Sequence, residues 1–125
     1  MTLDCERRRL LRGAAAAVVS TCASSAWSNN DLQFRAPTRY VNSEHPDIVA
    51  LVGQIAPSTL DPRERAVRIH DHVRDQIKFG WTSSFYEQSA SDVLKSGVGF
   101  CNTKGTLFTA MLRAADSPAR QHFVD

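Results

Sequence analysis

The feature that most constrains this chain is a glycine-rich approach to a cysteine, followed at once by a helical pattern. Residues 97–120 read GVGFCNTKGTLFTAMLRAADSPAR. Apolar residues recur at the spacing of one helix face: Leu107, Phe108, Met111, Leu112 and Ala115. The pattern predicts a helix from about Cys101 to Ala115, with the thiol of Cys101 directed toward the packed face. Glycine inside a helix costs ~1 kcal/mol relative to alanine, so Gly105 predicts the close approach of another backbone.

A cysteine in the first turn of a helix lies where the backbone favours negative charge. The first turn has unpaired N–H groups and a partial positive charge, which stabilise a thiolate and the oxyanion of a tetrahedral intermediate. Gly97 and Gly99 can bend the incoming chain and leave room for a substrate backbone. Cys101 is therefore a candidate nucleophile, and its backbone N–H is a candidate oxyanion donor. The alternative is a buried structural cysteine, and the spacing alone does not decide between the two.

The first 26 residues have the layout of an export signal. Residues 7–12 (RRRLLR) contain four arginines, and the stretch Ala14–Val19 is apolar. Ser24 and Ala26 fit a cleavage site that requires small residues. The basic run resembles a bacterial twin-arginine signal. The apolar stretch is too short to cross a bilayer, which takes ~20 residues. We expect an exported domain, periplasmic or extracellular, without stable membrane insertion; the alternative is a cytosolic protein with a basic tail.

The charge excess of the chain belongs to this N-terminal segment. The formal net charge is +2, from 15 basic and 13 acidic residues. Residues 1–12 contain four arginines, Asp4 and Glu6, so the remainder is formally neutral and nothing indicates a nucleic-acid partner. Cys5 and Cys22 also lie in the signal, which leaves Cys101 without a disulfide partner in the mature part. An unpaired cysteine in an exported domain is a candidate reactive thiol.

Other helices are predicted before the cysteine. Residues 27–44 are polar and mixed, and predict a linker or extended lead-in. Helical spacing over residues 48–55 ends at Pro57. The clearest helix follows Asp61 as its N-cap, with Glu64 completing a capping-box-like pattern.

The segments on either side of the cysteine helix are shorter. A short helix before it is capped by Ser89 or Ser91 and ends at Gly97. The segment KFGW leaves the preceding helix, and TSSFYEQ, which comes before the short helix, is interpreted as a loop. Pro118 ends the cysteine helix, and residues 119–125 predict the start of a strand.

Residues 89–120 resemble the core of the transglutaminase-like superfamily. Its members commonly show a short helix ending in Gly-x-Gly-x-Cys, and then a helix ending in Arg-Ala-x-Gly-Ile-Pro-Ala-Arg. The matching positions are Gly97, Gly99, Cys101, Leu112, Arg113, Ala114, Pro118, Ala119 and Arg120. Asp116 and Ser117 stand where glycine and a bulky apolar residue are usual, and aspartate is less comfortable than glycine in the left-handed conformation at a helix end.

The resemblance, which covers residues 45–125, implies an α+β fold with a papain-like core. This chain would hold mainly the helical half and the start of the sheet. The family implies a Cys-His-Asp triad and acyl transfer through a thioester, to an amine or to water, with no metal or cofactor. Cys101 takes the nucleophile position. The family's His and Asp lie on later strands, so we expect a truncated domain, inactive as it stands.

A base could also be sought locally. His122 lies on the predicted strand, where the family shows no catalytic residue. His45, His70 and His72 precede the cysteine on or beside helices, and we expect His70 to be a half-buried packing residue. Three hypotheses follow: a thiol acyl-transfer enzyme acting on a protein or peptide, a non-catalytic module of the same family that binds peptide or cell-wall material, and a fragment that does not fold.

The export hypothesis yields a first prediction. Mature protein should appear outside the cytoplasm with an N-terminus at about Trp27, and the double substitution Arg7→Lys and Arg8→Lys should block this export because the twin-arginine pair is lost. N-terminal sequencing of cell-envelope protein measures both outcomes. An intact Met1 in that fraction, or normal export of the double variant, would contradict the hypothesis.

Overall fold

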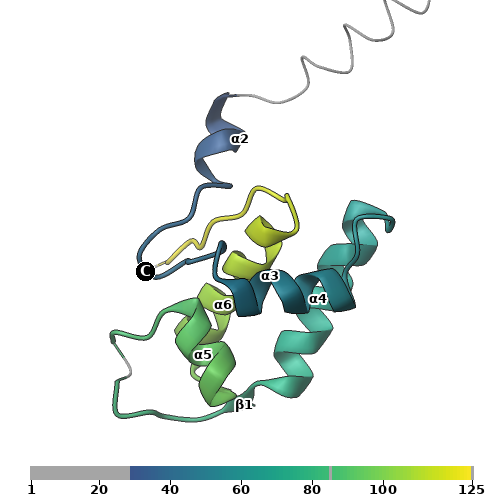
Figure 1. The fold of residues 1–125 in the computed structure, drawn as a ribbon. Helices are drawn as coiled ribbons and strands as arrows, with labels where there is room; N and C mark the ends of the chain where they lie inside the picture. Colours follow the sequence, from purple (N-terminus) through teal and green to yellow (C-terminus); the bar gives the residue numbers. More distant parts are fainter. Residues whose placement is uncertain (1–28, 85, 125) are drawn as a thin grey trace, which may run out of the picture. The chain divides into compact units, whose positions relative to one another are not determined.

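The computed structural model describes residues 29–84 and 86–124, so the expected export signal lies outside the described residues. The elements in chain order are α2 (Asn29–Gln33), α3 (Pro46–Ile55), α4 (Pro62–Gln76), β1 (Lys78–Phe79), α5 (Ala90–Ser96), β2 (Val98–Gly99) and α6 (Cys101–Ala114) (Figure 1). The chain divides into two units, residues 1–31 and 32–125, and α3 to α6 belong to the second. Over the described residues, no helix combines the length and apolarity needed to cross a membrane.

Side-chain caps start α3 and α4. Nδ1 of His45 accepts a hydrogen bond from the Asp47 N–H of α3 at 3.3 Å. The carboxylate of Asp61 caps α4 in the same way, at 3.1 Å from the Arg63 nitrogen, as the sequence predicts. The capping-box role predicted for Glu64 is wrong. Its carboxylate lies 2.9 Å from the guanidinium of Arg68 one turn later, an ion pair that draws the side chain away from the helix start.

Both ends of α5 are specified by local chemistry. The Ser89 hydroxyl accepts from the Asp92 N–H at 3.4 Å, and the Asp92 carboxylate accepts from the Ser89 N–H at 3.0 Å. The Ser89 hydroxyl also lies 2.7 Å from the Asp92 carboxylate, to which it can donate, and this contact together with the Ser89 N–H holds the pKa of Asp92 below its usual value. Gly97 ends the helix in the left-handed conformation, with φ of 67°, and its N–H donates to the Val93 carbonyl at 3.0 Å. The predicted start at Ser89 and end at Gly97 are confirmed.

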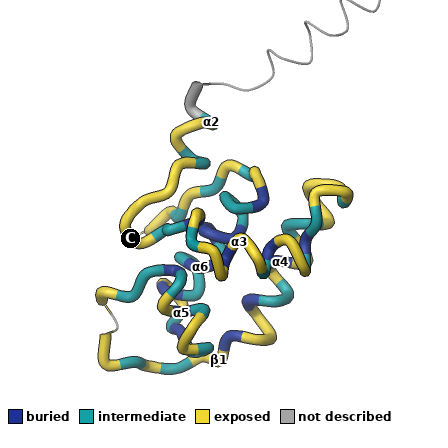
Figure 2. The backbone as a smooth tube through the Cα atoms, viewed as in Figure 1, coloured by how far each residue is buried: buried dark blue, intermediate teal, exposed yellow. Residues whose placement is uncertain are grey.

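The core lies where α6 contacts α3, α4 and α5, and the buried parts of these helices face one another (Figure 2). Its main apolar side chains are Ile48, Val52, Ile69, Val73, Val93, Leu107, Ala110 and Met111. Phe108 and Leu112, predicted on the packed face, lie at its margin and are partly buried. The buried face of α6 instead includes Thr103, whose polar side chain the apolar pattern does not reveal.

A short parallel strand pair precedes α6 in the chain, and its first strand lies where the sequence predicted only the exit from α4. β1 and β2 pair with Lys78 opposite Val98 and Phe79 opposite Gly99. The Lys78 N–H donates to the Gly97 carbonyl at 2.8 Å. This ladder brings the chain leaving α4 beside the chain entering α6, and so gives the helix-rich unit its α+β character.

The segment after α6 is not a strand over the described residues 117–124, so the predicted strand start is wrong there. Its backbone is bound to the lead-in instead, with the Ala119 N–H donating to the Phe34 carbonyl at 3.0 Å. The guanidinium of Arg113 joins the two segments, donating to the carbonyls of Ala119 at 2.9 Å and Ala36 at 2.6 Å. Burial lowers the pKa of Arg113. Asp116 adopts φ of 60°, the left-handed conformation in which glycine is usual in the family.

Two glycines give a matched stability prediction. A Cβ at Gly97 or at Gly53 would meet no atom within 4 Å, so neither substitution by alanine creates a clash. Gly97→Ala should destabilise the domain by about 1–2 kcal/mol because alanine is strained at positive φ. Gly53→Ala, inside α3, should stabilise it by about 0.5–1 kcal/mol through helix propensity. Chemical denaturation measures both free energies of unfolding, and shifts of the same sign would contradict the assignment of Gly97 as the left-handed cap.

Candidate active site

Cys101 is the first residue of α6, and its side chain is exposed. The predicted orientation toward the packed face is therefore wrong. α6 buries Thr103, Leu107 and Met111, and Cys101 lies on the opposite side of the helix with Gly105, one turn further along. The thiol lies 3.6 Å from Oδ1 of Asn102, to which it can donate. An exposed thiol at this position is not the buried structural cysteine of the alternative interpretation.

The N-terminus of α6 differs from those of α3, α4 and α5 in that its N-cap residue offers no side-chain acceptor. Phe100 occupies the N-cap position and its side chain makes no cap hydrogen bond, whereas the Thr103 hydroxyl accepts from the Phe100 N–H. A helix start normally needs acceptors for its first N–H groups. Here the N–H groups of the turn that contains Cys101 receive no such acceptor and remain available to an anion or a carbonyl oxygen.

Aromatic rings surround this uncapped start. The Phe100 ring lies 5.2 Å from the ring of Phe79 and 4.6 Å from the ring of Trp81, measured between centroids. Phe79 and Trp81 are two-thirds exposed, at 67% and 68%. β1 and the residues after it thus place apolar rings at the end of the helix that bears Cys101.

Gly99 is needed for internal packing in front of the cysteine. A Cβ there would lie 3.0 Å from Oγ1 of Thr103 and 3.1 Å from a side-chain carbon of Val93. The Thr103 hydroxyl accepts from the Phe100 N–H at 2.8 Å and so fixes the entry into α6. The prediction that Gly99 leaves room for a substrate backbone is therefore wrong, because Thr103 and Val93 border that space.

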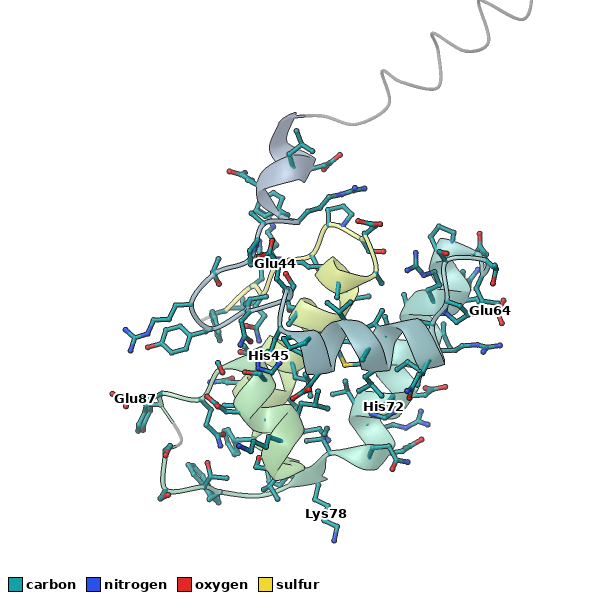
Figure 3. The ribbon with its side chains drawn as sticks, viewed as in Figure 1. Glu44, His45, Glu64, His72, Lys78 and Glu87 are labelled. Carbon is teal, nitrogen blue, oxygen red and sulfur yellow. The ribbon has the colours of Figure 1, made fainter. Side chains whose placement is uncertain are left out.

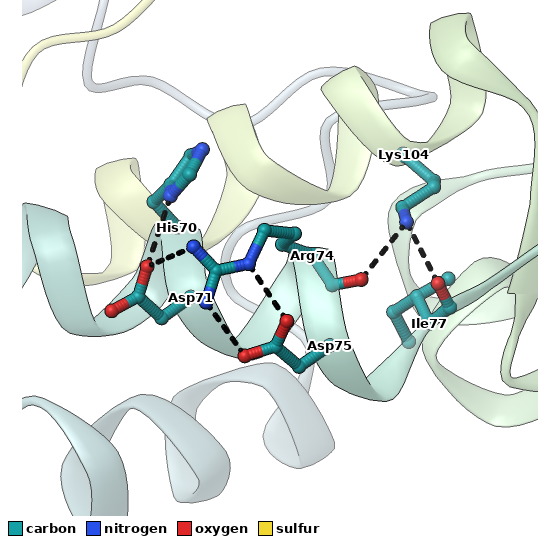
Figure 4. Close-up of polar contacts among 6 residues, drawn as sticks. All are labelled: His70, Asp71, Arg74, Asp75, Ile77 and Lys104. Carbon is teal, nitrogen blue, oxygen red and sulfur yellow. Dashed lines mark hydrogen bonds and ion pairs between the residues drawn. The ribbon is translucent and has the colours of Figure 1, made fainter.

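Lys104 attaches the first turns of α6 to the C-terminal end of α4. Its ammonium donates to the carbonyl of Ile77 at 2.7 Å and to that of Arg74 at 3.4 Å (Figure 4). The last carbonyls of a helix lack intrahelical partners and form the negative end of its dipole, so a cation there is favourable. Within the same turn of α4, the Arg74 guanidinium binds Asp75 at 2.7 Å and holds the pKa of that carboxyl below its usual value.

Gln121 fastens the C-terminal segment onto α6 beside Cys101. Its carboxamide nitrogen donates to the Asn102 carbonyl at 3.1 Å, and its oxygen accepts from the Thr106 hydroxyl at 3.2 Å. A Cβ at Gly105 would collide with this carboxamide. The close approach predicted at Gly105 is therefore real, but a side chain makes it rather than a backbone. Gly105 was the only feature of the sequence that pointed to a close contact at this position, and it did not identify Gln121 as the partner.

The four histidines do not form a dyad with Cys101, because no hydrogen bond joins it to any of them. His45 caps α3, and His72 lies on α4 (Figure 3). His70, expected to be half-buried, lies beside Asp71 with its side chain 58% exposed. Its ring still packs in a T-shaped arrangement with Phe108, at 6.0 Å between ring centroids. His122 is exposed and, within residues 29–84 and 86–124, makes no hydrogen bond or ion pair. These same residues contain no cluster of ligands suited to a metal ion.

Two cavities border α6, and Cys101 lines neither of them. The larger, of about 380 Å³, lies along Asn102 and Thr106 and is also lined by Gln121. The smaller, of about 270 Å³, lies between α4 and α6 and includes Lys104 and Phe108.

Comparisons with known proteins place the fold within a family. The family model described as the transglutaminase-like superfamily matches residues 49–124. No curated protein matches the chain. A crystal structure named as that of a candidate cysteine protease from Cytophaga hutchinsonii is similar, with a TM-score of 0.67 and 20% identity over 74% of this chain. The chain spans about a third, 32%, of that structure's length.

The Lys104 contact yields a prediction about how strongly α6 is held to the end of α4. Lys104→Met keeps most of the side-chain length but removes the charge and both hydrogen bonds, and should lower the free energy of unfolding by about 1–2 kcal/mol. Lys78→Met is the control, because Lys78 points away from the helices (Figure 3) and should change stability by less than about 0.5 kcal/mol. Equal losses in both variants, measured by chemical denaturation, would contradict the capping role of Lys104.

Proposed function

The chain belongs to the transglutaminase-like superfamily, and we propose that it is a thiol acyl-transfer enzyme whose nucleophile is Cys101. The observation that carries the proposal is the exposed thiol at the start of α6, the one helix among α3 to α6 whose N-cap residue offers no side-chain acceptor. A bulky capping side chain would occupy the space in which a substrate carbonyl must lie. The absence of one leaves the nucleophile and the N–H groups accessible together.

The proposed reaction has two steps. The sulfur of Cys101 attacks the carbonyl carbon of an amide, the first-turn N–H groups stabilise the oxyanion, and the carbon–nitrogen bond breaks as the amine leaves with a proton. The acyl group then passes from the thioester to an amine or to water, and the thiol is restored. The acyl donor is a protein or peptide, and we propose that the enzyme acts outside the cytoplasm.

The proton transfers need a general base, and a base must lie within hydrogen-bond reach of the group it serves. His122 is a candidate through its place in the chain, next to Gln121, which contacts α6. Its exposure and lack of an orienting partner among the described residues argue against it. We propose that the family's His and Asp supply the base, and that residues 1–125 alone form an acyl-enzyme without sustained turnover.

Acylation of the thiol tests the proposal. Cys5→Ser and Cys22→Ser leave Cys101 as the single thiol, and p-nitrophenyl acetate should convert it to a thioester detectable by intact-protein mass spectrometry. The control adds Cys101→Ala and Lys78→Cys, which moves the thiol to an exposed position away from a helix start. Cys101 should react roughly fivefold faster or more, because the first-turn N–H groups can stabilise the oxyanion that forms on attack. Equal rates would contradict the nucleophile assignment.

Turnover separates the remaining hypotheses. With a peptide amide as donor, we expect no sustained release of amine by the 125-residue chain, because a base is missing from the contacts of Cys101. Sustained release that His122→Ala abolishes would make His122 the base. Failure of both acylation and turnover in a folded chain would favour the non-catalytic module.

A further inference from the structure

We propose that the larger cavity beside α6 binds an uncharged N-acetylated sugar. Its role as a recognition subsite for the substrate of Cys101 rests on the function proposed above, whereas the binding itself does not. The cavity is formed by side chains from separate parts of the chain: the lead-in, the segment before α5, the first turns of α6 and the C-terminal segment. With about 380 Å³, it falls within the range of roughly 300–1,000 Å³ typical of small-molecule sites.

The lining of this cavity carries no acidic or basic side chain. Charged residues make up 22% of the sequence, so a lining of ten residues would contain about two of them by composition alone. The smaller cavity on α6 differs, since it includes His70, Arg74 and Lys104. Removing a charged group from water without a partner is costly. The larger cavity therefore favours an uncharged ligand.

Carboxamides give the cavity its hydrogen-bonding character. Gln88, Asn102 and Gln121 all line it. The Gln121 carboxamide is engaged on α6, and Oδ1 of Asn102 faces the Cys101 thiol. Within the described part of the chain, neither the Gln88 carboxamide nor the Asn102 amide nitrogen has a hydrogen-bond partner. An amide offers both donors and an acceptor, which suits the hydroxyl and acetamido groups of a sugar.

Aromatic rings supply the apolar part of the same lining. Tyr40, Tyr86 and Phe123 border the cavity and are 41%, 87% and 75% exposed. The Arg39 guanidinium already lies 5.3 Å from the centroid of the Tyr40 ring. Phe123 therefore offers the ring on which the apolar C–H face of a pyranose can stack while the sugar hydroxyls bond to amides. An extended peptide would instead seek the backbone of a strand edge, and neither β1 nor β2 contributes to this lining. The combination of rings, amides and no charge favours the sugar.

Asn102 connects the cavity to the proposed chemistry. Its side chain lines the cavity, and its Oδ1 lies 3.6 Å from the sulfur of Cys101. A sugar held there would therefore lie next to Cys101. The subsite would thus recognise a sugar attached to, or neighbouring, the acyl group that is transferred.

Titration of the full chain with N,N′-diacetylchitobiose tests the binding. Saturable shifts of the Gln88 and Asn102 side-chain amide signals in ¹H–¹⁵N spectra are expected. Phe123→Ala should weaken binding about fivefold or more by removing a ring from the cavity. Phe79→Ala is the matched control, because Phe79 is comparably exposed, at 67%, but lies outside the lining, and it should change the Kd by less than about twofold. Gln88→Leu provides a second variant in a different segment and should weaken binding as well.

Further arms separate this proposal from the acyl-transfer proposal and from other ligands. Cys101→Ala should keep the Kd within about twofold, because the thiol lines no part of the cavity, so binding can persist where acylation fails. Protonated glucosamine should bind more weakly than N-acetylglucosamine. Three outcomes would each overturn the proposal. They are the absence of saturable shifts, equal losses of affinity in Phe123→Ala and Phe79→Ala, and preferential binding of glucosamine or of the neutral peptide acetyl-Gln-Gly-amide.

Discussion

The position of the candidate nucleophile depends on the ammonium group of Lys104 at the end of α4. Lys104 and Cys101 share one turn of α6, so the bonds from Lys104 to the carbonyls of Ile77 and Arg74 locate the cysteine as well. The contact joins the negative end of one helix to the positive end of another, and the cation compensates the carbonyls that α4 cannot pair internally. Thr103 and Gln121 restrain the same stretch of helix from other sides. The turn is therefore fixed by polar contacts, whereas the apolar core begins at Leu107.

This arrangement explains how an exposed thiol can still occupy a defined place. Cys101 is exposed at the start of α6, yet the first turns of this helix are held by the contact of Lys104 with the end of α4 and by Gln121 of the C-terminal segment. A neutral cavity and a partly basic cavity both border this helix, so its surroundings are chemically uneven. A substrate bound at the thiol would meet the uncharged cavity on one side and the partly basic cavity on the other. This difference would favour one orientation of the substrate along α6.

The helix boundaries could be predicted from the sequence because the determinants are local. Asp61, Ser89 and Gly97 act on backbone groups within one turn of themselves. The orientation of Cys101 was mispredicted because the apolar pattern of α6 locates its buried face only approximately, and Thr103 is buried through a hydrogen bond to Phe100 rather than through apolarity. The two-residue strands are too short to show a periodicity. The contacts of Lys104 and Gln121 join residues 27 and 19 positions apart, which no local pattern encodes.

The contact between the lead-in and the C-terminal segment bears on the order in which the domain assembles. Arg113 reaches the carbonyl of Ala36 across 77 residues, and the entropy lost on closing a loop rises with the logarithm of its length. We therefore expect this junction to form after α3 to α6 have packed, and to be among the first parts to separate during local unfolding. Gln121 and Phe123, which follow the junction, would open with it. Access to the larger cavity would then be set by the frequency of this opening as well as by the shape of the closed state.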